Sequence, residues 1–360
     1  MLLEGTAPIE PGYGLRRDVM MPSRGTRASI WAWARWLLLA ITILFVVRAA
    51  STGWPEIRSA MQTITRENVH LVVVAIGVES LWVLTLAQVY RSALVAFGGT
   101  ADFRLAIRVS MSAFTLSRVL PGGGAVGALF AAREFIRGGN RNGITLIALV
   151  AAGWVSLSAL GVVVLVAIGG GVMSGTLPIS YLIPPVLVLG VLLIVGAVAV
   201  IAAKRPACRR STQGLLVRLF GSWGVGLSRN DLEHALRTVP RLRDMFRVFT
   251  WSSISWVLDA AALGLVFAAF GYPLEVAVLA VGYGVANLIQ ALPELTPGWL
   301  GVLEGSLSVT YASLGVPAGA AVVVILVYRL ISFWMPVAAG LPFAWGIMRA
   351  QKGKKALERP

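Results

Sequence analysis

The segment from Ala291 to Gly305 reads ALPELTPGWLGVLEG and lies between apolar runs long enough to span a bilayer. It contains two prolines, three glycines and two carboxylates, namely Pro293, Pro297, Gly298, Gly301, Gly305, Glu294 and Glu304. Proline lacks a backbone donor and interrupts a helix, and freed backbone polar groups cannot face lipid. The segment therefore predicts a broken helix that is buried within protein or lines a water-filled cavity.

The composition predicts an all-α polytopic membrane protein. Of the 360 residues, 57% are hydrophobic and 13% are charged, whereas soluble domains average about 25% charged residues. Several apolar runs approach the ~20 residues needed to cross ~30 Å of hydrocarbon. The net charge of +15 comes mostly from residues beside these runs, so it indicates membrane topology rather than a nucleic-acid partner. A single cysteine, Cys208, excludes an intramolecular disulfide and a Cys-rich metal site.

Charge and hydropathy divide the chain into five parts. They are a disordered basic tail (1–30), a first membrane half (33–203), a basic loop (204–247), a second membrane half (248–348) and a short basic tail (349–360). The positive-inside rule puts both tails and the loop in the cytoplasm. We therefore expect a multi-pass protein of the plasma (inner) membrane with cytoplasmic N- and C-termini.

About six full transmembrane helices and two broken elements are expected, which makes about eight hydrophobic spans. The full spans are near Trp36–Ala50, Val69–Tyr90, Ile144–Gly169, Ile179–Ala203, Phe249–Phe270 and Gly319–Met348. The broken elements are 105–136 and 275–314. A full crossing at 105–136 would put Arg133, Arg137 and Arg141 outside, so a re-entrant pair or two half-helices are favoured there.

The two halves share a sequence pattern. Ala96-Phe97-Gly98 precedes an apolar helix that ends at Leu120-Pro121, and Ala269-Phe270-Gly271 precedes one that ends at Leu292-Pro293. Aligning the two breaks also matches Gly139 with Gly315. Loop charges indicate that the first unit enters from the cytoplasm and the second from outside. This is the pattern of an inverted repeat, which in transporters points to a binding site near the midplane; a coincidence of spacing between packed helices is the alternative.

Ionisable residues inside the membrane are candidates for function. They are Glu79, Asp259, Glu304, Arg329 and, beside the first break, Arg118. Arg329 lies about ten residues into its span and needs a partner, which we expect to be Glu304, Asp259 or Glu79. It is either a structural ion pair or an anion-binding residue for a phosphate headgroup. Glu79 and Asp259 are either proton carriers or satisfied packing carboxylates.

The glycines of the first break allow a second interpretation. Gly122, Gly123 and Gly124 could expose the N–H groups of a half-helix to an anion, with Arg118 one turn earlier; a simple hinge explains them equally well. Pro293, Pro297 and Gly298 are the corresponding candidates at the second break. The formal G-x-G-x-x-G match is rejected as a dinucleotide site because an apolar helix, not a strand, precedes it. Tryptophans such as Trp82 and Trp154 are interpreted as interface anchors.

No catalytic constellation stands out. His70 and His234 are far apart, and no H-E-x-x-H, D-x-D or C-x-x-C motif occurs. The sequence therefore predicts a protein that is not an enzyme and that needs no cofactor or metal.

Several motifs together resemble the membrane domain of lysyl-phosphatidylglycerol synthases, also called the flippase-like membrane domain. They are Leu292–Gly305, Leu314-Gly315-Val316, Tyr328-Arg329 before Phe333-Trp334, and Leu120–Gly124 with the following Arg133. The similarity covers about residues 36–348. One departure is that residues 125–132 contain no acid where relatives often have one. The soluble synthase domain has no counterpart in this sequence.

The resemblance implies translocation of an aminoacylated or other anionic lipid between leaflets, without lipid synthesis. Our first hypothesis is a flippase or transporter of an anionic phospholipid or lipid-linked intermediate, whose partners are anionic lipid headgroups. The alternative is a non-catalytic membrane scaffold that partners a cell-envelope glycosyltransferase or lipid-modifying enzyme through the basic loop 204–247.

Overall fold

The computed structural model describes residues 68–120, 123–205, 229–238, 240–290 and 297–357. These residues form helices joined by short connections, and no strand occurs among them. The expected tail 1–30, the expected first span and Cys208 lie outside the described residues, as does most of the loop 204–247.

Within that described part, five helices are long and apolar enough to cross a bilayer. They are α3 (Val69–Ala96), α6 (Asn142–Met173), α7 (Ile183–Lys204) with the short η1 (Ile179–Leu182) before it, α10 (Leu242–Ala269), and a continuous run of α13 (Ala318–Arg329), η3 (Leu330–Trp334) and α14 (Met335–Leu357). They coincide with the last five of the six expected full spans. The chain is a polytopic α-helical membrane protein, because only helices and closed barrels satisfy the backbone within lipid.

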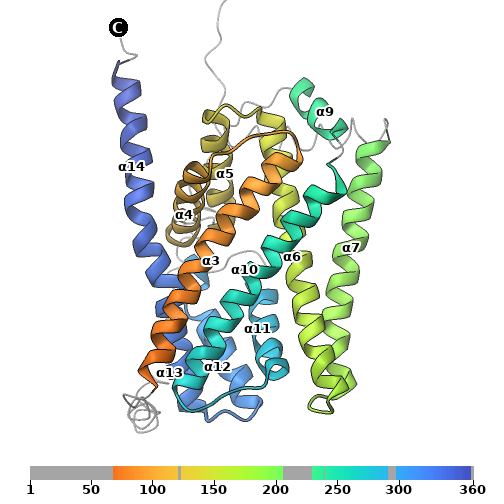
Figure 1. Cartoon of the computed structure of the whole chain (residues 1–360), viewed down its shortest axis with the longest axis vertical. Coiled ribbons are helices and arrows are strands. Elements are labelled where there is room, and N and C mark those ends of the chain that lie inside the picture. Colours follow the sequence, from red (N-terminus) through yellow and green to blue (C-terminus); the bar gives the residue numbers. More distant parts are fainter. Residues whose placement is uncertain (1–67, 121–122, 206–228, 239, 291–296, 358–360) are drawn as a thin grey trace, which may run out of the picture.

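The centre of the molecule is the pair α3 and α10, which pack along each other and run in opposite directions (Figure 1). Each helix has 28 residues. Each carries one carboxylate near its middle, Glu79 on α3 and Asp259 on α10. The two acidic side chains that the sequence singled out therefore lie on neighbouring helices of the core.

The expected broken element 105–136 is a helical hairpin. α4 (Phe103–Val119) ends before Pro121, and α5 (Gly123–Arg137) returns alongside it. The helices approach closely because Gly127 has no side chain: a Cβ there would lie 2.5 Å from the backbone oxygen of Ala113. The position of the break follows from proline and glycine, which end the first helix and allow the turn.

The expected broken element 275–314 forms a second hairpin. It consists of α11 (Val276–Gln290), a turn that contains η2 (Pro297–Trp299), and α12 (Val302–Ser313). Tyr311 of α12 packs onto Gly282 of α11, where a Cβ would lie 2.3 Å from the ring, and its hydroxyl donates to the backbone oxygen of Leu279 at 2.8 Å.

The two hairpins approach the middle of the molecule from opposite ends. In Figure 1, α4 and α5 lie in the upper half, and α11 and α12 lie in the lower half. The connections before and after the two hairpins each contain a glycine with positive φ. Gly98 and Gly271 follow α3 and α10 with φ of 83° and 80°, and Gly139 and Gly315 follow the hairpins with φ of 98° and 99°. These matched left-handed glycines, which end helices readily, fall in the order that the sequence pattern predicted.

The last span is interrupted by a π-helical segment. η3 follows Arg329 directly and precedes Pro336. Proline supplies no backbone N–H, and a π-turn is one way to accommodate the change in hydrogen bonding; such turns occur often at functional sites. The smaller helix α9 (Arg229–Arg237) lies at the upper end in Figure 1, where Arg141 contacts its Asp231 at 3.4 Å.

Candidate functional site

A polar cavity lies where the two hairpins meet the α3–α10 pair. The space between its lining residues that is not filled by atoms, including the part open to the surroundings, is about 590 Å³. Its charged lining residues are Glu79, Arg118, Asp259 and Arg329, and its other polar lining residues are Tyr283, Asn287, Gln290, Tyr328 and Ser332. Ionisable side chains from α3, α4, α10 and α13 thus converge on one space inside a bundle whose outer surface is largely apolar.

Asp259 is held by two tyrosines. Tyr283 of α11 donates to its Oδ2 at 2.7 Å, and Tyr328 of α13 donates to its Oδ1 at 2.6 Å. Both oxygens of the carboxylate therefore accept a phenolic proton. Hydrogen bonds to an ionised group are roughly twice as strong as neutral ones, so this arrangement stabilises Asp259 as an anion.

Glu79 has a different environment. The residue is 1% exposed, and its Oε2 has no hydrogen-bond partner among the described residues. It lines the same cavity as Asp259. The sequence left a packing role and a proton-carrying role open for both carboxylates. Both oxygens of Asp259 have hydrogen-bond donors, whereas Oε2 of Glu79 has no partner among the described residues.

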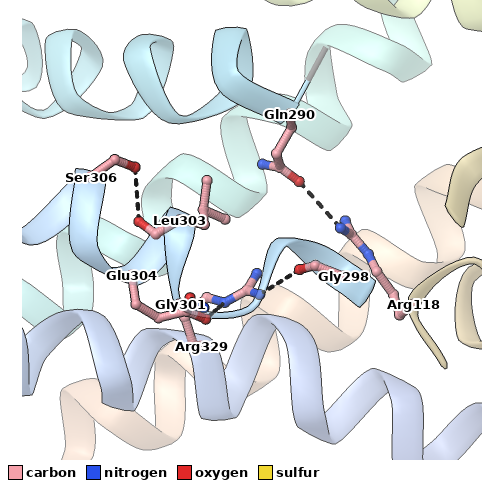
Figure 2. A network of polar contacts seen from close by, with 8 residues as sticks. All are labelled: Arg118, Gln290, Gly298, Gly301, Leu303, Glu304, Ser306 and Arg329. Atoms are coloured by element: carbon pink, nitrogen blue, oxygen red, sulfur yellow. Dashed lines mark hydrogen bonds and ion pairs between the residues drawn. The ribbon is translucent and has the colours of Figure 1, made fainter. Parts of the chain in front are cut away.

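Arg118 joins the tips of the two hairpins. It lies one residue before the end of α4, and its Nη1 donates to Oε1 of Gln290, the last residue of α11, at 3.2 Å (Figure 2). Its guanidinium lies over the rings of Phe114 and Phe333, 5.1 and 5.7 Å from their centroids. Arg118 therefore places a guanidinium in the lining of the cavity at the point where the two hairpin tips meet.

Arg329 forms a buried ion pair with Glu304. Its Nε donates to Glu304 Oε1 at 2.6 Å, and its Nη2 donates to the backbone oxygen of Gly298 at 3.0 Å (Figure 2). Glu304 also accepts from the N–H of Gly301 at 2.6 Å, which caps the start of α12. The expectation that Arg329 has an acidic partner is confirmed. These contacts tie α13 to the second hairpin's turn.

Gly298 fits tightly into this junction. Its φ is 61°, and a Cβ would lie 2.6 Å from the ring of Phe333 and 3.2 Å from the backbone oxygen of Arg118. Phe333 also lies under the Arg329 guanidinium, 4.3 Å from it. One aromatic ring of the π segment thus contacts the second turn and both arginines.

The candidate residues are distributed unevenly around the cavity. Arg118, Arg329, Asp259 and Glu79 line it. Glu304 and Gly298 lie behind Arg329, which they hold. Gly123 and Gly124 begin α5 and are not among the residues that line the cavity. Pro297 begins η2, and Gly122 and Pro293 lie outside the described residues.

The sequence analysis missed the tyrosines, amides and tryptophans of the site. The most informative are Tyr283, Tyr328, Gln290 and Trp256. The available signal was their position in the sequence: Tyr283 lies four residues before Asn287, and Tyr328 lies one residue before Arg329. Polar groups clustered on apolar helices need partners. The interpretation of Trp82 and Trp154 as interface anchors is wrong: Trp82 lines the cavity, and Trp154 packs in mid-span against Gly196.

The fold and the site define a class of protein. It is a helical membrane protein with two opposed helical hairpins and a cavity lined by ionisable side chains where they meet. Within that class, the chain belongs to the family described as the lysylphosphatidylglycerol synthase TM region, whose model matches residues 34–340.

Curated relatives are named UPF0104 membrane proteins. Two from Methanothermobacter thermautotrophicus are 37% identical over 97 residues and 38% identical over 90 residues, and one from Pyrococcus horikoshii is 31% identical over 117 residues. These matches cover 27%, 25% and 32% of this chain and 29%, 26% and 34% of the relatives. The chain therefore matches about a third or less of each relative's length.

Proposed function

We propose that this protein moves an anionic phospholipid, or a lipid-linked intermediate with a phosphate headgroup, between the two leaflets. The observation that carries the proposal is the polar cavity at the junction of the two hairpin tips, where Arg118 meets Gln290. Its polar lining residues offer hydrogen-bonding groups to a headgroup whose acyl chains stay in lipid.

The two arginines of the cavity have different roles in this proposal. Arg118 contacts the phosphate, because guanidinium geometry matches phosphate oxygens and this side chain lines the cavity. Arg329 is already neutralised by Glu304 and anchors the second turn. The proposal therefore gives the anion-binding role to Arg118 and the structural role to Arg329.

The distribution of charge supports a cytoplasmic position for the upper end in Figure 1. The connections at the lower end, 174–178, 270–275 and 314–317, contain no Lys or Arg. The ends of α5, α9 and α14 at the upper end are basic. By the positive-inside rule, the first hairpin then opens toward the cytoplasm and the second toward the outside.

Lipid exchange in reconstituted vesicles tests the proposal. Phosphatidylglycerol with a fluorophore on its acyl chain is incorporated, and a membrane-impermeant quencher is added from outside. We expect the protein to make the inner-leaflet fluorophore accessible, and Arg118→Ala to slow this by about ten- to hundredfold, since a hydrogen bond to a charged group contributes about 1.5–3 kcal/mol.

A matched control is Arg141→Ala, which also removes one positive charge but affects a surface contact with Asp231. It should exchange lipid at the wild-type rate. Equal rates for Arg118→Ala and wild type would contradict the proposal. Absence of exchange, together with co-purification of a membrane enzyme that depends on residues 204–247, would favour the scaffold function instead.

A further inference from the structure

The side chain of Glu79 is the one charged group of the cavity that carries an orphan atom among the described residues. It is 1% exposed, and its Oε2 has no partner there. An isolated carboxylate in a low-dielectric interior is far more costly than a neutral carboxylic acid. The orphan oxygen is therefore the natural place for a proton.

The groups that face Glu79 reinforce this assignment. α10 contributes Asp259, whose two oxygens each accept a tyrosine proton. α11 and α13 contribute Tyr283 and Tyr328, whose hydroxyls are used for those bonds. The positive groups of the cavity are Arg118 on α4 and Arg329 on α13, the latter paired with Glu304 of α12. α6, which also packs on α3, contains no titratable side chain.

The charge of Glu79 affects any anion in the cavity. An ionised Glu79 would add a second carboxylate to the space that Asp259 and the two arginines also line. A phosphate headgroup is repelled by that extra charge and is accepted when Glu79 is neutral, because the interaction between charges is strong where water is scarce.

We propose that Glu79 is a proton-binding site that couples proton uptake to binding of the anionic headgroup beside Arg118. Protonation of Glu79 favours the headgroup, and by thermodynamic reciprocity the bound headgroup favours the proton. A pH difference across the membrane would then drive or bias lipid movement. This inference rests on the proposed function for its headgroup, but the proton site itself is measured without any lipid.

The proton site is tested by infrared spectroscopy of the purified full-length protein. A protonated carboxylic acid has a C=O stretching band that shifts in D₂O. We expect this band in the wild type at neutral pH, its loss in Glu79→Gln, and its retention in Asp259→Asn and in Glu275→Gln, which changes an exposed acid outside the cavity. Survival of the band in a folded Glu79→Gln variant overturns the proton site.

The coupling is tested in vesicles that contain the fluorescent phosphatidylglycerol. We expect wild-type exchange to slow as pH rises through the ionisation of Glu79, by at most about tenfold per pH unit for one titrating proton. The isosteric Glu79→Gln variant should exchange at a rate that no longer depends on pH, and Glu275→Gln should follow the wild type. An unchanged pH profile in Glu79→Gln overturns the coupling, as does a wild-type profile that is flat.

The proposed lipid function and the proton coupling at Glu79 can be refuted independently of each other. If the wild type exchanges no lipid, the proposed function fails, and the infrared band still decides whether Glu79 holds a proton. If exchange depends on Arg118 but not on Glu79, the lipid function stands and the coupling falls. A response to a sodium gradient at constant pH that is lost in Glu79→Gln would identify a metal cation rather than a proton and overturn the inference.

Discussion

Nη1 of Arg118 donates to Oε1 of Gln290 at 3.2 Å, and this contact joins the tips of two hairpins that enter the molecule from opposite ends. The two residues are separated by 172 positions in the chain. Each occurs within one residue of the end of its helix. A charge-assisted hydrogen bond thus connects the two hairpin tips next to the cavity.

The Arg118–Gln290 contact can be strengthened without changing its shape. Gln290→Glu replaces the amide by a carboxylate that pairs with Arg118. We expect a higher thermal unfolding temperature and slower phosphatidylglycerol exchange, because the tips are held together and the arginine charge is neutralised. Exchange in vesicles and thermal unfolding followed by size-exclusion chromatography measure both effects. Gln290→Ala, which removes the bond, should not show the stabilisation, and rapid exchange by Gln290→Glu would count against the assigned role of Arg118.

The buried Arg329–Glu304 pair should be essential for stability. Removing one partner of a buried pair costs about 3–5 kcal/mol, so Arg329→Gln and Glu304→Gln should each unfold at a markedly lower temperature. The double variant should recover part of the loss, as expected for directly coupled residues. The exposed pair Arg237–Glu233, also 2.6 Å apart, is the control, and its removal should cost about 0.3–0.5 kcal/mol. Strictly additive effects of Arg329→Gln and Glu304→Gln would show that the pair is not a structural unit.

Two glycines of α5 should respond oppositely to substitution by alanine. At Gly127 a Cβ meets the α4 backbone at 2.5 Å, whereas at Gly124 nothing lies within 4 Å. Gly127→Ala should destabilise the first hairpin by about 1–3 kcal/mol through overpacking. Gly124→Ala should be neutral or stabilising by up to about 1 kcal/mol because it restricts the unfolded chain. Comparison of thermal unfolding in the two variants tests the close approach of α4 and α5, and equal effects would contradict it.

The two tyrosine hydroxyls of α12 and α13 should contribute unequally to stability. Tyr328 donates to the carboxylate of Asp259, whereas Tyr311 donates to the neutral backbone oxygen of Leu279. Tyr328→Phe should cost about 1.5–3 kcal/mol and Tyr311→Phe about 0.5–1.5 kcal/mol. Thermal unfolding measures the difference. Equal losses would indicate that Asp259 is not ionised.

The breaks and the ion pair could be predicted from sequence because their causes are local or few. Proline and glycine end helices wherever the chain runs. An arginine near the midplane needs an acid, and the expected partners were Glu304, Asp259 and Glu79; the partner found is Glu304. Likewise, the order of glycines in the sequence predicted that the connection at Gly98 matches the one at Gly271, and that Gly139 matches Gly315.

The composition of the cavity could not be predicted because it depends on how each helix is rotated. In a membrane helix the core-facing and lipid-facing sides are both apolar, so hydrophobic periodicity carries little information about rotation. Tyr283 and Tyr328 are separated from Asp259 by 24 and 69 positions. Their proximity in sequence to Asn287 and Arg329 indicates a polar cluster, but it does not identify Asp259 as the acceptor of their hydroxyl protons. The same ambiguity explains the wrong interpretation of Trp82.

The meeting of the two hairpins bears on the electrostatic barrier that the proposed substrate has to cross. A charge that crosses plain bilayer must leave water for ~30 Å of hydrocarbon. Here the tips bring Arg118 and Gln290 together from opposite ends of the molecule (Figure 1). The Born energy of an ion falls wherever such dipoles and charges replace hydrocarbon. For the proposed anionic headgroup, the thick single barrier would therefore be divided into two thinner ones, with a well between them at the place where the hairpins touch.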